Sequence, residues 1–186
     1  MFEALIEKDK QLLIYLNNLG SEQWDPFWLF ITNQFNWAPV FLLVIFLIFK
    51  NLGWKRGGFL FLFMIAMVAF SDQFTNLIRV TFERLRPNND ININHLLRTL
   101  ITPQSYSFTS GHATTSMVFS VFVVLLFRKK YKYIKLLFIF PIVFAYSRLY
   151  LGVHFPVDIL TGASVGTIIG ITFFKCYSWI DKKLFA

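Results

Sequence analysis

Residues 147–158 read SRLYLGVHFPVD and join two apolar segments, at about 133–146 and 157–180. The hydroxyl and ionisable side chains of this junction are Ser147, Arg148, His154 and Asp158. Ionisable groups beside a bilayer are costly, so their place at the end of one apolar segment and the start of the next favours a functional site. The junction therefore predicts a bundle of membrane-spanning helices and the position of a site within it.

The composition of the whole chain agrees with a membrane protein. The 186 residues are enough for one domain, and 56% of them are hydrophobic, with 24 Phe and a mean hydropathy of +0.56. A soluble domain of this size cannot bury that much apolar surface, whereas a bilayer can solvate it. We therefore expect a single transmembrane domain over residues 1–186.

An α-helix needs roughly 20 residues to cross about 30 Å of hydrocarbon. Five segments are candidates, at about 27–49, 58–78, 112–127, 133–146 and 157–180. Polar residues and Pro39 interrupt the first, so its outer part is expected to form a separate interfacial helix. The predicted fold is an all-α integral membrane bundle of five or six transmembrane helices over residues 27–180.

The N-terminal 20 residues have the pattern of an amphipathic helix. Their apolar residues at helical spacing are Phe2, Leu5, Ile6, Leu12, Leu13 and Leu16. Lys8, Asp9 and Lys10 interrupt this face, and Gly20 follows it. The pattern predicts an interfacial helix that lies on the membrane instead of crossing it.

The net charge of +8 could indicate nucleic-acid binding, but the distribution of the basic residues favours membrane topology. Clusters at 50–56, 128–135 and 175–183 alternate onto one face and hold 11 of the 18 basic residues. Such a bias marks the cytoplasmic side. We therefore expect a protein of the bacterial inner membrane with a cytoplasmic C-terminus, a periplasmic site and no nucleic-acid partner.

Three polar blocks share the opposite, outer face. They are RVTFERLRP at 79–87, SFTSGH at 107–112 and the junction at 147–158. Together they bring Arg79, Arg86 and Arg148, whose rigid donor forks match phosphate oxygens. The expected start of a helix at Ser110 and Gly111 adds free backbone N–H groups that favour an anion. Ser110 can cap that helix, donate to a phosphate oxygen, or do both.

Two histidines and one carboxylate have the spacing for phosphoryl transfer. His154 and Asp158 are four residues apart and share a face if a helix starts near Pro156, so the carboxylate can orient the imidazole as a nucleophile. His112, from another helix, is free to protonate a leaving group. No two histidines have metal-ligand spacing and there is no acidic cluster, so we expect neither a metal nor a cofactor.

The role of other charged residues in these regions is less specific. Arg84 and Glu83 are expected to be a solvated pair, and His95 and Arg98 to face solvent or headgroups, with substrate recognition as the alternative. Asp72 is either a buried partner of a nearby arginine or a support for the site.

The three blocks resemble the signature of the type 2 phosphatidic acid phosphatase superfamily of membrane lipid phosphatases. That signature is Lys, six residues, Arg-Pro; then Pro-Ser-Gly-His; then Ser-Arg, five residues, His, three residues, Asp. The third block matches at every defined position. Arg79 stands where the family usually has Lys, and Thr109 where it usually has Pro.

The resemblance implies a phosphohistidine mechanism without a metal. His154 would be the nucleophile, Asp158 would polarise it and His112 would be the general acid. The phosphate would be bound by Arg79, Arg86, Ser110, Gly111 and Arg148. The implied substrates are undecaprenyl diphosphate, phosphatidic acid, phosphatidylglycerol phosphate or lipid A phosphates. A lipid phosphotransferase and a non-catalytic lipid-headgroup binding or transport protein are the alternatives.

Overall fold

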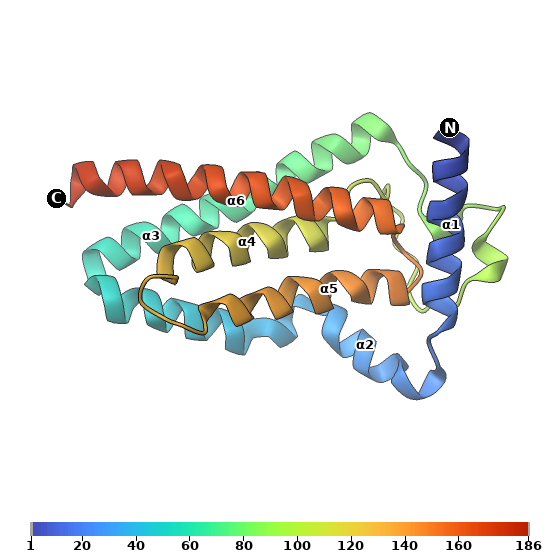
Figure 1. The fold of residues 1–186 in the computed structure, drawn as a ribbon, viewed down its shortest axis with the longest axis horizontal. Helices are drawn as coiled ribbons and strands as arrows, with labels where there is room; N and C mark the ends of the chain where they lie inside the picture. Colours follow the sequence, from blue (N-terminus) through green and yellow to red (C-terminus); the bar gives the residue numbers. More distant parts are fainter. Residues whose placement is uncertain (1, 186) are drawn as a thin grey trace.

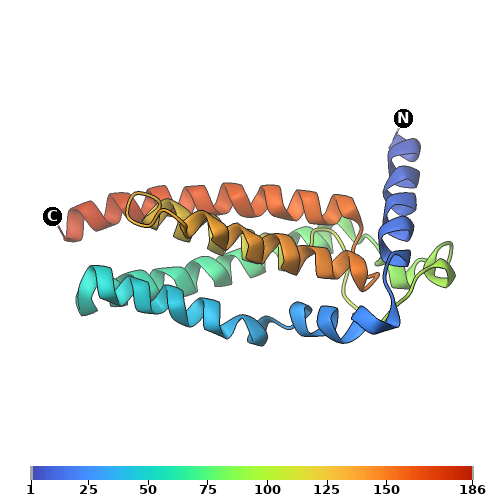
Figure 2. The same cartoon turned by 60° about the horizontal axis from the view of Figure 1, so that its bottom comes forward.

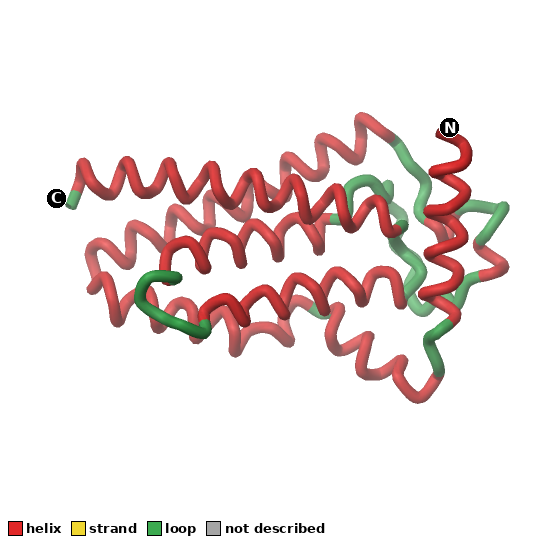
Figure 3. The backbone as a smooth tube through the Cα atoms, in the orientation of Figure 1, coloured by secondary structure: helices red, strands yellow, loops and turns green. Residues whose placement is uncertain are grey.

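The computed structural model describes residues 2–185, which form helices joined by loops and contain no β-strand (Figures 1 and 3). The helices are α1 Phe2–Asn18, α2 Asp25–Thr32, α3 Ala38–Phe82, α4 Gly111–Phe127, α5 Ile139–Tyr150 and α6 Pro156–Leu184. The short 3-10 turns are η1 Glu22–Trp24, η2 Gln34–Trp37, η3 Pro87–Asn89, η4 Asn94–Leu96 and η5 Ile134–Phe138. The all-helical class predicted from the sequence is confirmed.

The helix α3 is a hairpin of two antiparallel arms (Figure 1). The arms meet at Gly53, whose φ of 70° lies in the left-handed region that glycine adopts most readily. They correspond to the first two predicted spans. The structure assigns residues 27–32 to the separate helix α2, as the polar interruption predicted, so the first arm begins only at Ala38.

The outer surface of the bundle is apolar. Large apolar side chains that are exposed on it include Leu42, Leu43, Phe46, Leu62, Ile142 and Ile168. Such a surface suits lipid, since a helix that is hydrophobic all round fits a membrane span. Within residues 2–185, Gln34–Asn89 and Pro156–Leu184 are long and apolar enough to cross a membrane, and α4 is apolar but has 17 residues. The number of crossing helices therefore stays a prediction.

The helix α4 lies at the centre of the bundle and packs on α3, α5 and α6. Its contact with α6 runs along a stripe of glycines, at Gly162, Gly166 and Gly170, which lets the two backbones approach closely. A Cβ at Gly166 would collide with the carbonyl oxygen of Thr114. This close contact sets the start of α4 beside the start of α6.

The helix α1 crosses the end of the bundle instead of joining it (Figures 1 and 2). Its buried stripe is Asp9, Leu13 and Asn17, while Leu5, Ile6 and Leu12 are exposed. The apolar face predicted from the sequence is therefore divided, and Asp9 turns inward instead of interrupting a membrane-facing surface. The side chain of Phe2, also predicted for that face, lies outside the described part of the chain.

The three basic clusters lie together at the end of the bundle away from α1 (Figure 1). The α3 turn, the α4–α5 connection and the C-terminal end of α6 meet there. The loops that carry the three polar blocks lie at the other end, beside α1. The two ends therefore differ in charge and in polar chemistry, as the alternation of basic segments predicted.

Candidate active site

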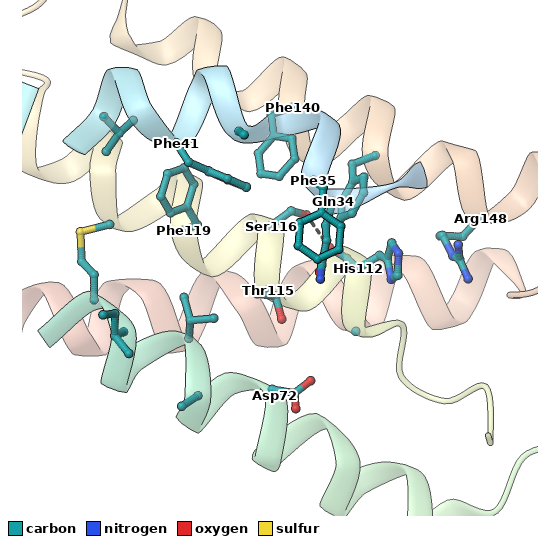
Figure 4. A pocket seen from close by; sticks show the side chains of 18 of the residues that line it. Gln34, Phe35, Phe41, Asp72, His112, Thr115, Ser116, Phe119, Phe140 and Arg148 are labelled. Atoms are coloured by element: carbon teal, nitrogen blue, oxygen red, sulfur yellow. Dashed lines mark hydrogen bonds between the residues drawn. The ribbon is translucent and has the colours of Figure 1, made fainter. Parts of the chain in front are cut away.

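A cavity of about 1030 Å³ lies between the two arms of α3, α4 and α5 (Figure 4). Aromatic and aliphatic side chains line most of it, including Phe41, Val44, Ile48, Met64, Phe119 and Phe140. The charged and imidazole side chains that line it are Asp72, Arg79, Arg86, His112, Arg148 and His154. Figure 4 shows His112 and Arg148 on one side of the phenylalanine cluster and Asp72 on the opposing α3 arm. The structure thus joins one apolar chamber to a cationic end.

Three arginines reach this cationic end from different elements. Arg79, near the end of α3, donates from Nε to the carbonyl oxygen of Thr109 at 3.1 Å. Arg148, near the end of α5, donates from Nη1 to Oγ1 of Thr32 at 2.5 Å, and its buried Nε has no partner among residues 2–185. Both side chains therefore bind neutral oxygens only.

Arg86 is held most tightly of the three. It donates to the carbonyl oxygen of Ser105 at 2.6 Å, to Oγ of Ser105 at 2.9 Å and to the carbonyl oxygen of Val153 at 3.0 Å. Burial, and then the charge of Arg79, lower the pKa of Arg86 to about 10, so it keeps its charge at neutral pH. Within residues 2–185, no carboxylate lies within 4 Å of these three guanidiniums. Their positive charge is therefore available to an anion.

His154 lies in the loop between α5 and α6 with 1% of its surface exposed. Its Nε2 is 3.1 Å from Nη1 of Arg86. A guanidinium can only donate, so Nε2 is an acceptor and the ring proton belongs on Nδ1. Burial, followed by the charges of Arg86, Arg148 and Arg79, lowers the pKa of His154 well below 6.5. The imidazole is therefore neutral near pH 7, with its Nε2 lone pair directed toward Arg86.

Asp158 stands behind His154, at the first turn of α6. Its Oδ2 accepts from the backbone N–H of Phe155 at 2.9 Å and lies 3.5 Å from Nδ1 of His154. The predicted hydrogen bond between the pair is thus present only as a long contact. His154 precedes the first residue of α6, so the two side chains lie close together without sharing a helix face.

The start of α4 supplies the remaining predicted residues. His112 lines the cavity, and its ring stacks on Phe144 with centroids 4.6 Å apart. Gly111 lies against Arg79, where an added Cβ would be 2.8 Å from Nη2. Ser110 accepts at Oγ from the N–H of Ala113 at 3.5 Å and is fully buried outside the cavity lining. Ser110 therefore caps α4, and its contact with phosphate stays a prediction.

Sequence reasoning missed the partners of Arg84. This side chain donates to Asp158 and to Asp9, both at 2.7 Å, so it is not the solvated partner of Glu83. Arg98 is partly exposed, and it too has a carboxylate partner, since it donates to Asp25 at 2.9 Å. Each of these partners is more than 70 residues away in the chain, so no local sequence pattern predicts the contact.

Asp72 is linked to the site through an amide. Asn76 donates to Asp72 at 3.3 Å and accepts from Arg79 at 3.2 Å. Of the two expected roles, the structure favours a support for the site, since Asp72 faces the cavity and reaches Arg79 only through Asn76.

Comparison with known proteins places the chain in a family. The model of the PAP2 superfamily matches residues 57–182. A lipid A 4'-phosphatase of Bacteroides thetaiotaomicron is 32% identical over 182 residues, covering 94% of this chain and 79% of that protein. An undecaprenyl-diphosphatase of Sulfolobus acidocaldarius is 31% identical over 159 residues, covering 85% of this chain and 66% of that protein.

The fold agrees with that of a solved membrane phosphatase. The crystal structure of the first transmembrane PAP2-type phosphatidylglycerolphosphate phosphatase, from Bacillus subtilis, matches with a TM-score of 0.70. The two chains are 21% identical, and the match covers 97% of this chain and 88% of that one. Both the resemblance and the enzyme class predicted from the three blocks are confirmed. The chain belongs to the PAP2 superfamily and is a membrane-associated lipid phosphatase.

Proposed function

We propose that the protein removes a phosphate from lipid A at the periplasmic face of the inner membrane, through a phosphohistidine on His154. The observation that carries the proposal is the cationic end of the cavity, where three arginines without carboxylate partners surround a neutral imidazole. The choice of lipid A is supported by the relative named lipid A 4'-phosphatase, whose match covers 94% of this chain.

The proposed reaction has two displacements. Nε2 of His154 attacks the phosphorus, the bond to the leaving oxygen breaks, and His112, which must start as the imidazolium, gives that oxygen its proton. Water then attacks the phosphohistidine, gives a proton to His112 and releases inorganic phosphate, which restores the Nε2 lone pair. Arg79, Arg86 and Arg148 stabilise the charge on the phosphoryl oxygens in both steps.

The apolar part of the cavity is proposed to receive an acyl chain. Phe61 and Asp72, which both line it, are 11 residues apart on one α3 arm. At 1.5 Å per residue this is about 16 Å, or roughly half of a 30 Å hydrocarbon core. A lipid held with its phosphate at the arginines would therefore keep a chain within one leaflet. The lysine and arginine clusters at the far end support a cytoplasmic C-terminus.

The test is phosphate release by the purified protein from lipid A in detergent with EDTA present. We expect turnover in EDTA and its loss in His154→Ala. In the unsubstituted protein, a quench without acid should preserve the phosphohistidine, so that a phosphoprotein is detected. His95→Ala is the matched control, because His95 is exposed and outside the cavity lining. Activity that EDTA removes, or that His154→Ala retains, would contradict the proposal.

Undecaprenyl diphosphate is the second candidate substrate, since relatives of this chain are named as its phosphatases. Lipid A, undecaprenyl diphosphate, phosphatidic acid and phosphatidylglycerol phosphate should be compared side by side by kcat/KM. A second lipid with a free hydroxyl, added to the same assay, distinguishes hydrolysis from phosphotransfer by where the phosphate ends. Curated phosphatases among the relatives already argue against a non-catalytic lipid binder.

A further inference from the structure

Arg84 connects the interfacial helix α1 to the carboxylate behind His154. Its Nη2 donates to Oδ2 of Asp9 and its Nη1 donates to Oδ1 of Asp158, both at 2.7 Å. Its guanidinium also lies over the ring of Phe155, 3.9 Å from the centroid. A planar fork of donors can hold two carboxylates at once in a way that a lysine cannot. The position of Arg84 is thus set by α1 on one side and by the start of α6 on the other.

Asp9 makes a second contact with α6. Its Oδ1 accepts from the backbone N–H of Val157 at 2.9 Å, and the side chain is 3% exposed. Val157 is in the first turn of α6, where N–H groups lack partners within the helix and a carboxylate is stabilising. Besides Asp158, which accepts from Phe155, a second carboxylate caps the start of α6, and it comes from α1, 148 residues away in the chain.

We propose that Arg84 and Asp9 are positioning residues for His154 and Asp158, by which α1 holds the Asp158 carboxylate in place and sets its charge. The inference rests on the proposed function, in which His154 is the nucleophile. The helix α1 precedes the region that matches the PAP2 family, residues 57–182, so part of the support for the site comes from outside that region.

The reason lies in how Asp158 is bound. One oxygen accepts from Arg84 and the other from the backbone of Phe155, which leaves the carboxylate little freedom to rotate away from the imidazole. Loss of Arg84 would free one oxygen and remove a cation from beside it. The carboxylate would then favour protonation of His154 more strongly, because its negative charge is less compensated.

The other charged or titratable groups around His154 come from every neighbouring element. They are Arg79 of α3, Arg86 of the following loop, His112 of α4, Arg148 of α5 and Asp158 of α6. All of them stay unchanged in variants of Arg84 and Asp9. A shift in the titration of His154 in those variants therefore reports on the Arg84 bridge.

The experiment follows the His154 imidazole by ¹³C NMR as a function of pH, in histidine-labelled protein in detergent micelles. The chain has three histidines, and His154→Gln assigns the signal. We expect Arg84→Gln to raise the pKa of His154 by about one unit, the low end for one nearby charge. Asp9→Asn, which keeps an oxygen to accept from the Val157 N–H, should lower the pKa of His154.

Activity supplies the second readout, with lipid A as the probe. In Arg84→Gln we expect kcat to fall by up to about 100-fold, the effect of a misplaced reacting group, with KM less affected. Arg84→Lys should restore the His154 titration but only part of kcat. Lys10→Gln is the matched control, since Lys10 is next to Asp9 on α1 and forms an ion pair at 2.7 Å with Asp90 without touching Asp158.

Unchanged titration in both Arg84→Gln and Asp9→Asn would overturn the inference, as would an equal shift in Lys10→Gln. If Arg84→Gln does not fold, the opposite shift in Asp9→Asn decides alone. The NMR readout needs no turnover, so it tests the bridge even if lipid A is not hydrolysed. Activity that survives in His154→Ala would instead contradict the proposed function.

Discussion

At the end of the bundle away from the cavity, Arg56 donates to both carboxylate oxygens of Asp181, and Tyr177 donates to the same carboxylate at 3.1 Å. At the cavity end, the three lining arginines donate only to carbonyl, hydroxyl, amide and imidazole groups. A half-buried cation with a carboxylate partner is neutralised and serves the fold. Clustered cations that lack a carboxylate partner repel each other, and a bound anion relieves that repulsion.

The same distinction separates arginines within the cavity end. Arg84 and Arg98 have carboxylate partners and tie α1, α2 and the loops to the bundle. Whether an arginine binds an anion here therefore depends on its partners, and the sequence block RVTFERLRP contains both kinds.

The largest expected effect comes from removing one unpaired arginine. Arg86→Met should lower kcat/KM for lipid A by about 10²–10³-fold, the loss seen when one donor to a developing anion is removed. Its thermal stability in detergent should fall as well, because the carbonyl oxygens of Ser105 and Val153 lose a buried donor. Steady-state kinetics and a melting curve check both parts.

Arg56→Met is the counterpart at the other end. It should leave kcat/KM within about twofold and lower stability by about 1–2 kcal/mol, less than for a fully buried pair because Arg56 is 40% exposed. A kinetic loss in Arg56→Met equal to that in Arg86→Met would break the distinction between the two ends.

Inorganic phosphate should bind at the cavity end and raise the melting temperature. At 100 times its dissociation constant, a ligand of the folded state stabilises by about 2.7 kcal/mol. Arg148→Met should lose most of this stabilisation, because its buried Nε has no other partner among residues 2–185. Arg56→Met should keep it, and a phosphate effect that Arg148→Met retains would place the anion elsewhere.

The smallest expected effect is the pH dependence due to His154. The unfolded chain takes up a proton near pH 6.5, whereas the folded imidazole stays neutral to a lower pH because of burial and the nearby arginines. The unfolded state thus binds more protons, so stability is lost as pH falls below about 6.5, by at most about 1.4 kcal/mol per unit. Melting temperatures between pH 5 and 8 measure it.

His154→Gln is the control, since it should reduce that slope by the share due to His154, while Arg56→Met keeps it. The acid limb of kcat/KM should likewise lie below pH 6.5, because kcat/KM reports the free enzyme. An acid limb above pH 6.5 would show that His154 is protonated in the free enzyme.

Most of the predicted site could be located from the sequence because its residues lie at helix ends. Each of the three blocks adjoins an apolar segment, and the alternation of basic clusters assigns those ends to one face. Because both histidines belong to blocks on that face, their position at one cavity follows from this alternation. The roles of Arg84 and Asp9 do not, because they depend on contacts across 74 and 75 residues.

The sequence by itself determined that this protein is an apolar helical bundle and that its predicted phosphate-binding residues gather at one end, because hydropathy and spacing are local properties of the chain. Only the tertiary structure decided which arginines are neutralised by carboxylates and which stay available to an anion. The physical reason is that charge compensation depends on distances of a few ångströms between residues that the chain order keeps far apart.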